Sequence, residues 1–209
     1  MWVGIGVLIG ILVFFNNSCQ TASTPEPVPA TPAPVTPTAP VTPVTPSSPV
    51  PAWTADTLIT DGEYQGGAGT EGYEIFWNSD DQYIYIGIRA ETSGWVAVGF
   101  EPSPLHRETD TIIGFASEAE SGVHDMFSTG DLGPCQMDTD LGGTDDILEA
   151  ATAEADGYTT IEFKRALDTG DAYDGRLVNG TNEIIWAYSN HDDPRQKHTH
   201  RGRLEISLP

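Results

Sequence analysis

The sequence predicts an antiparallel β-sandwich for residues 53–209, and three observations support this fold class. Apolar and polar residues alternate with a period of two in many short segments. In Gln82–Ala90, for example, three isoleucines fall on one face and two tyrosines on the other. Helical periodicity is nearly absent, and turn pairs such as Asp156-Gly157 and Asn179-Gly180 separate the segments. Many short strands with turns at this spacing are typical of an all-β sandwich.

The same alternation places the individual strands in order along the chain. Each candidate segment combines β-branched or aromatic residues with a turn signal at one end or both. The expected strands are Tyr73–Asn78, Gln82–Ala90, Gly94–Phe100, Thr111–Ala116, Val123–Ser128, Ile147–Ala155, Gly157–Arg165, Glu183–Ser189 and Leu204–Leu208.

Residues 1–19 are expected to be a signal peptide or a lipoprotein signal. Residues 2–15 are an uninterrupted apolar run, which is shorter than the ~20 residues that a membrane-spanning helix needs. The run ends at Ser18-Cys19, so Cys19 is a candidate lipidation site. Simple secretion and an uncleaved N-terminal anchor are the alternatives. All three place the remaining chain outside the cytoplasm, at the cell surface or in the periplasm.

Residues 20–52 are expected to form a stalk rather than a domain. Proline recurs every two to four residues among threonine, valine and alanine. Such a segment cannot build a core and favours extended polyproline II structure. At ~3.1 Å per residue it could reach on the order of 100 Å. The membrane is therefore expected to be contacted only through the N-terminus.

The charge of the chain excludes one class of partner. The net charge is −22, from 31 acidic and 9 basic residues. Nucleic-acid phosphates would be repelled by this surface, so we expect no nucleic-acid binding. Downstream of Cys19 the only cysteine is Cys135, which has no internal disulfide partner.

Histidines provide the first candidates for chemistry. His106 lies in a loop stiffened by two prolines, and a stiff loop suits a ligand because it loses little entropy on binding. His198 and His200 lie near the last strand, and as alternate residues of a strand they would share a face. Imidazoles far apart in sequence, at the ends of β-structure, are what a metal or haem site needs. Each histidine by itself also fits an ordinary core or surface residue, as we expect for His191 in its Asp-rich turn.

Aromatic and acidic residues leave two further alternatives open. Trp95, Phe100 and Trp186 fall on strand segments, where they would either fill the core or line a flat apolar ligand. The acidic segment from Asp138 to Glu149 loosely resembles a calcium-binding loop. It lacks flanking helices and has an acid at a position that is usually apolar, so we interpret it as a solvated loop and do not expect calcium there.

Taken in order, the motifs GWVAVGF, DTIIGF, DMFSTGD, GYTTIEFKRALDTGDAYD and EIIWAYS, followed by a histidine, Arg-Gly and a final strand, resemble a DOMON domain. The resemblance covers residues 55–208 and implies an immunoglobulin-like β-sandwich. Some families of this kind bind haem b and transfer electrons. Others are thought to bind sugars, or to act as accessory domains beside monooxygenase or membrane cytochrome modules.

The resemblance also implies a set of haem ligands. Haem-binding members use a methionine four residues before the aspartate of the DTIIGF-like strand, and here that position is His106. The C-terminal histidine ligand matches His198 best, with His200 as the alternative. Trp95, Phe100 and Trp186 are the expected wall residues. Replacement of methionine by histidine leaves two interpretations, bis-imidazole ligation of the iron or loss of the haem site.

Three functional hypotheses follow. The first is an exported, surface-tethered DOMON domain that binds haem b and transfers electrons to a redox protein or a membrane cytochrome, without being an enzyme itself. The second is a haem-free module for carbohydrate or another small ligand, in which exposed aromatics such as Trp53 and Tyr64 stack on sugar rings. The third is a structural domain of the cell surface.

Overall fold

A computed structural model describes residues 53–70, 72–102, 107–117, 121–130 and 135–209. The chain divides into two units, residues 1–45 and 46–209, and every described residue belongs to the second. The predicted signal, the lipidation site Cys19, the stalk and the loop histidine His106 lie outside the described residues.

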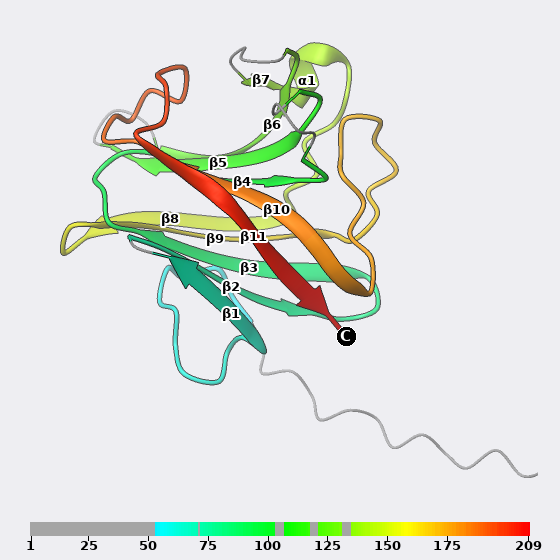
Figure 1. Cartoon of the computed structure of the whole chain (residues 1–209), viewed down its shortest axis with the longest axis horizontal. Helices are drawn as coiled ribbons and strands as arrows, with labels where there is room; N and C mark the ends of the chain where they lie inside the picture. The colour runs from blue at the N-terminus through cyan, green and yellow to red at the C-terminus, as the bar shows by residue number, and fades with distance from the viewer. Residues whose placement is uncertain (1–52, 71, 103–106, 118–120, 131–134) are drawn as a thin grey trace, which may run out of the picture. The chain divides into compact units, whose positions relative to one another are not determined.

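Two stacked antiparallel sheets form the domain, which confirms the predicted β-sandwich (Figure 1). The five-stranded sheet has the order β1 (Gly66–Thr70), β2 (Tyr73–Ser79), β3 (Tyr83–Ala90), β9 (Tyr158–Ala166) and β8 (Glu149–Ala155). The six-stranded sheet has the order β11 (His200–Leu208), β10 (Gly180–Tyr188), β4 (Val96–Phe100), β5 (Asp110–Ala116), β6 (Ser121–Ser128) and β7 (Cys135–Met137).

One short helix, α1 (Asp138–Leu141), follows β7. With four residues, it is far below the length that crosses a membrane, and the described ranges contain no other helix.

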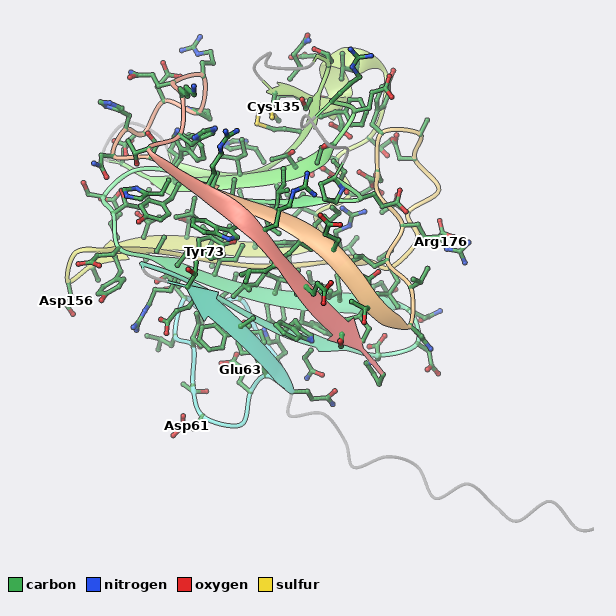
Figure 2. The ribbon with its side chains drawn as sticks, viewed as in Figure 1. Asp61, Glu63, Tyr73, Cys135, Asp156 and Arg176 are labelled. Atoms are coloured by element: carbon green, nitrogen blue, oxygen red, sulfur yellow. The ribbon has the colours of Figure 1, made fainter. Side chains whose placement is uncertain are left out.

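The main core lies between the sheets, where period-two alternation brings one side of each strand inward. Tyr73, Ile86 and Ile161 from the five-stranded sheet are all completely buried, and the side chain of Tyr73 projects between the layers (Figure 2). Ile112 and Ile184 meet them from the six-stranded sheet. Burying each such side chain contributes about 1.5–3 kcal/mol, so this core is the main source of stability.

The turn pair Asp156-Gly157 behaves as the sequence predicts. Both residues have positive φ, 55° and 83°, as a two-residue type I′ hairpin requires. They join β8 to β9 at the tip of a hairpin, where Asp156 is labelled in Figure 2.

Glycines face tryptophans at one edge of each sheet. In the edge strand β1, Gly66 pairs with Trp77, and in the edge strand β11, Gly202 pairs with Trp186. A Cβ atom would lie 2.2 Å from the Trp77 ring at Gly66 and 2.7 Å from the Trp186 ring at Gly202. Each indole therefore occupies the space left by the missing side chain of the neighbouring strand.

The segment 53–65 crosses the outer face of the five-stranded sheet, and we call it the N-terminal strap. Glu162 of β9 anchors it by accepting hydrogen bonds from the backbone N–H of Asp56 (2.9 Å) and Thr57 (2.5 Å) and from the hydroxyl of Tyr64 (2.5 Å). The Tyr64 hydroxyl also accepts a hydrogen bond from Trp53 Nε1 at 2.9 Å. Glu162 is fully buried and fully partnered, so the strap is an integral part of the domain.

Candidate functional site

A second apolar cluster lies on the outer face of the six-stranded sheet, and we call it the outer cluster. Its buried members are Trp95, Ala97, Ile113, Phe115 and Met126. They alternate along the strands with residues of the main core, which places them on the opposite side of the sheet. Every residue of β4 is buried, so both faces of this strand are shielded from solvent.

Partly buried residues extend the outer cluster toward β7 and β10. They are Cys135, Met137 and Ala187. Cys135 lies at the start of β7 (Figure 2), and burial raises the pKa of its thiol to about 11. The thiol is therefore protonated near neutral pH and acts as a small apolar group.

Two polar atoms lie in this apolar region without a hydrogen-bond partner in the part of the chain that the structure describes. They are Trp95 Nε1 and His124 Nε2, and both are buried. His124 stands opposite Ile113 in the β5–β6 pairing and stacks on Phe115, with ring centroids 5.4 Å apart. A buried indole N–H or imidazole nitrogen without a partner costs free energy, so each is a candidate contact for a ligand.

Two of the three predicted histidine ligands, His198 and His200, lie near the start of β11. His198 is half-buried and precedes β11, while His200 is the exposed first residue of that strand. The sequence suggested that the two histidines are alternate residues of one strand, but only His200 belongs to a strand. The His200 ring stacks on Tyr188 at 4.5 Å, and its Nδ1 lies 3.1 Å from Thr199 Oγ1. His191 is exposed in the preceding loop.

The three predicted wall residues do not lie on one side of the sheet. Trp95 belongs to the outer cluster, whereas Phe100 and Trp186 are part of the main core between the sheets. Trp186 stacks on Tyr73 at 4.9 Å, and Phe100 lies under the guanidinium of Arg165 at 5.2 Å. The sheet thus separates Trp95 from the other two.

Sequence reasoning missed His124, Ile113 and Phe115 as residues of the outer face. One signal for them exists in the sequence. Ile112 and Ile113 are consecutive apolar residues within a strand, and they point to opposite faces. Such a pair indicates a strand with both sides buried.

The fold and the outer cluster define a β-sandwich module with an apolar, histidine-bordered outer face. The DOMON domain family model matches residues 69–189, so the chain belongs to the DOMON domain family.

Three similar proteins are each several times longer than the region they share with this chain. DBH-like monooxygenase protein 1 of Mus musculus is 30% identical over 125 residues, which is 58% of this chain and 19% of the relative. Its Homo sapiens counterpart is 27% identical over 140 residues, 65% of this chain and 22% of the relative. MOXD1 homolog 2 of Drosophila melanogaster is 27% identical over 123 residues, 58% of this chain and 16% of the relative. The matched region spans about a fifth of these relatives.

Two cytochrome domains are among the solved structures that match this chain. The cytochrome b domain of pyranose dehydrogenase from Coprinopsis cinerea has a TM-score of 0.45 at 15% identity, covering 64% of this chain and 74% of that chain. The cytochrome domain of Myriococcum thermophilum cellobiose dehydrogenase has a TM-score of 0.47 at 12% identity, covering 66% of this chain and 75% of that chain.

Proposed function

We propose that this protein is an exported, surface-tethered DOMON module that binds haem b at the outer cluster and takes part in electron transfer. The observation that carries the proposal is the outer cluster itself. It is apolar and buried, and two polar ring atoms, Trp95 Nε1 within it and His124 Nε2 beside it, lack partners among the described residues. A flat apolar ligand with imidazole ligation fits such a face.

The residues present fit haem in their chemistry. His106 and His198 would supply axial imidazoles, and Trp95 would line the ring. His200, the alternative to His198, stands opposite Tyr188 on the core side of the sheet and therefore does not fit a ligand at the outer cluster. Arg201 stands opposite Ala187 in the β10–β11 pairing, so its position faces the same side as the outer cluster, where a cation suits the haem propionates. Bound haem would exchange single electrons with a partner protein, while the chain itself provides ligands, excludes water and performs no catalysis.

An absorption spectrum of the protein purified from haem-replete cells tests the proposal. We expect a Soret band, with split visible bands on reduction, and a saturable Soret shift when haem is titrated into the apoprotein. His106→Ala and His198→Ala should each abolish the six-coordinate spectrum. The exposed loop variant His191→Ala is the matched control and should leave it intact. A titration without saturation would overturn haem binding.

A second pair of variants tests which side of the sheet is used. Trp95→Phe should weaken haem binding, because Trp95 lies in the outer cluster. Trp186→Phe should leave the affinity unchanged, because Trp186 lies on the other side of the sheet. The reverse result would place the ligand between the sheets and contradict the assigned face.

Surface attachment rests on the sequence alone. If Cys19 is lipidated, Cys19→Ala should release the protein into the medium. Unchanged membrane association of this variant would instead favour an uncleaved N-terminal anchor.

A groove under the N-terminal strap favours a second candidate function, binding of a carbohydrate. The groove has a volume of about 440 Å³ and is lined by Tyr64, Phe76, Glu74 and Arg89, among others. Aromatic rings beside charged groups suit sugar rings and hydroxyls. Trp53 and Tyr64 are half-buried and hydrogen-bonded to each other, so Phe76 is the better stacking residue to test. Calorimetric titration with oligosaccharides, repeated on Phe76→Ala, would support this function if binding occurs and is lost in the variant.

A further inference from the structure

Four aspartates gather at the end of the sandwich near α1, and we call them the aspartate cluster. Asp110 opens β5, Asp125 lies in β6, Asp138 opens α1, and Asp174 lies in the loop between β9 and β10. Asp110, Asp125 and Asp138 are at most 2% exposed, and the Asp174 side chain is 2% exposed. Asp125 pairs with the core residue Ile112, so the cluster lies on the core side of the sheet, away from the outer cluster.

The spacing of the carboxylates suits one shared ion. Asp110, Asp125 and Asp174 each offer an oxygen, and these oxygens all lie within 4.8 Å of one another. Two oxygens bound to the same calcium ion, each at about 2.4 Å, can be at most about 5 Å apart. The three carboxylates can therefore contact a common centre.

Several oxygens of the cluster have no hydrogen-bond partner among the residues that the structure describes. Asp110 Oδ2 accepts from Arg165 Nη1 at 2.5 Å and from the Gly175 N–H at 2.9 Å, and Asp125 Oδ2 accepts from the Asp146 N–H at 2.9 Å. Asp110 Oδ1, Asp125 Oδ1 and both carboxylate oxygens of Asp138 are buried and have no partner within the described ranges. Unpartnered buried oxygens on three different aspartates are the observation that points to a ligand.

The four carboxylates of the cluster outnumber the cations that form ion pairs with them in the described part of the chain. The one cation that forms ion pairs with it, among the described residues, is Arg165, which bonds Asp110 and lies 3.5 Å from Asp174. Four ionised carboxylates against one guanidinium leave an excess of negative charge in a buried region, which is costly. The carboxylates must either take up protons or bind a cation.

Burial also favours the protonated form of three aspartates of the cluster. It raises the pKa of Asp125 to about 8, of Asp138 to about 7 and of Asp110 to about 6, although Arg165 opposes the last shift. A bound cation would replace the protons and offset the cost of burying ionised carboxylates.

A cavity of about 370 Å³ adjoins the cluster and provides a route for an ion. Asp110 and Asp174 line it, together with Glu101, Glu108 and Tyr173. Two further carboxylates near the site attract cations toward it.

We propose that the aspartate cluster binds one calcium ion. The donor atoms are carboxylate oxygens, which are the ligands of hard cations, and no sulfur or imidazole is among them. Water in the adjoining cavity can complete the large coordination shell that calcium takes. The bound ion would join β5, β6 and the loop that carries Asp174, and Asp138 would add negative charge nearby. The acidic segment 138–149 supplies none of the three carboxylates that share the ion, although the Asp146 N–H holds Asp125 in place.

This inference goes beyond the proposed haem function and is independent of it. The full-length protein, freed of metal with EDTA, should bind one calcium ion per chain in calorimetric titration. Its thermal unfolding midpoint should rise by several degrees in calcium, because the ion binds the folded state. Magnesium should bind more weakly, because it demands a regular octahedron of ligands.

Two variants separate this site from general binding to an acidic surface. Asp125→Asn should weaken calcium binding by at least about tenfold and remove the midpoint shift. Asp140→Asn, on the exposed side of α1, is the matched control and should bind as the unchanged protein does. Equal loss in both variants would assign the ion to the exposed loop and overturn the proposal.

A measurement on the unchanged chain guards against a variant that fails to fold. Terbium, a luminescent substitute for calcium, should show emission sensitised by Tyr173, which lines the adjoining cavity, and calcium should compete it away. Identical unfolding midpoints in EDTA and in calcium, together with no sensitised terbium emission, would overturn the proposal.

Discussion

Glu162 and the aspartate cluster bury carboxylates in the same sandwich under opposite conditions. Glu162 is fully buried and accepts three hydrogen bonds from the strap, two of them from backbone N–H groups. The aspartate cluster places four carboxylates together. Among the described residues, a single guanidinium forms ion pairs with them, and oxygens of Asp110, Asp125 and Asp138 have no partner. The first is complete without any ligand, whereas the second is complete only with protons or a cation.

The difference shows how to separate a structural carboxylate from a binding one. Burial raises the pKa of both Glu162 and Asp125, so a shifted pKa does not distinguish them. The number of donors does, because a carboxylate with every oxygen satisfied by the protein has nothing to offer a ligand.

The largest expected effect comes from removing the single cation of the cluster. Arg165→Met should lower the free energy of unfolding by about 3–5 kcal/mol, because it leaves buried carboxylates without their partner. Chemical denaturation measures it. Arg176→Met is the control, since Arg176 and Asp168 form an exposed pair at 67% and 54% exposure, and it should change stability by less than about 1 kcal/mol. Equal effects of the two variants would contradict the assigned role of Arg165.

A smaller loss is expected from the satisfied carboxylate. Glu162→Gln turns an acceptor group partly into a donor facing other donors, which should cost about 1–3 kcal/mol. The strap should also become sensitive to limited proteolysis within residues 53–65. Glu91→Gln, at an exposed position, is the control. A strap as resistant as that of the unchanged protein would argue against Glu162 as its anchor.

The pH dependence of stability should differ between the metal-free and calcium-bound protein. The folded-state pKa values of Asp110, Asp138 and Asp125 are raised to about 6, 7 and 8, so their protonated forms favour folding. This contribution is present below the unfolded pKa of about 4 and is lost as the pH rises toward 8. The metal-free unfolding midpoint should therefore fall by several degrees between pH 5 and pH 8. Calcium or Asp125→Asn should flatten the curve, and an unchanged slope in both would contradict the role of the cluster.

The smallest expected loss of stability comes from removing a single hydrogen bond to Glu162. Tyr64→Phe removes one donor to Glu162 and the acceptor for Trp53, and should cost about 1 kcal/mol in chemical denaturation. Tyr85→Phe removes a bond to Asp80 at an exposed site and should cost less. The opposite order would indicate that Glu162 is satisfied without Tyr64.

Alternation along the chain was sufficient to predict most of the fold. In most strands the apolar residues repeat at every second position, and this pattern located all of them. The pattern missed only β1 and β7. The edge strand β1 contains three glycines, which show no alternation, and β7 has only three residues. The start of β11 at His200 rather than Leu204 also escaped detection, because the glycine and the charged residues before Leu204 carry no apolar pattern.

The sites were less accessible to sequence reasoning, for two physical reasons. Trp95 and Phe100 stand an odd number of residues apart in one extended segment, so they cannot share a face, and this parity was available from the sequence. The aspartate cluster, in contrast, could not be predicted from the sequence. Asp110, Asp125 and Asp174 come from separate parts of the chain and meet only through strand pairing and a long loop. No local spacing records such a meeting.

The glycine–tryptophan pairs at the sheet edges act as markers of strand register. If β1 moved by two positions against β2, Ala68 would take the place of Gly66 beneath the Trp77 indole, and its methyl group would clash with the ring. Gly202 marks the register of β11 in the same way. A shift by two positions would bring His200 or Leu204, which lie on the same face, against the Trp186 indole. An edge strand has only one neighbour to align it, and in both sheets a residue without a side chain marks its correct alignment.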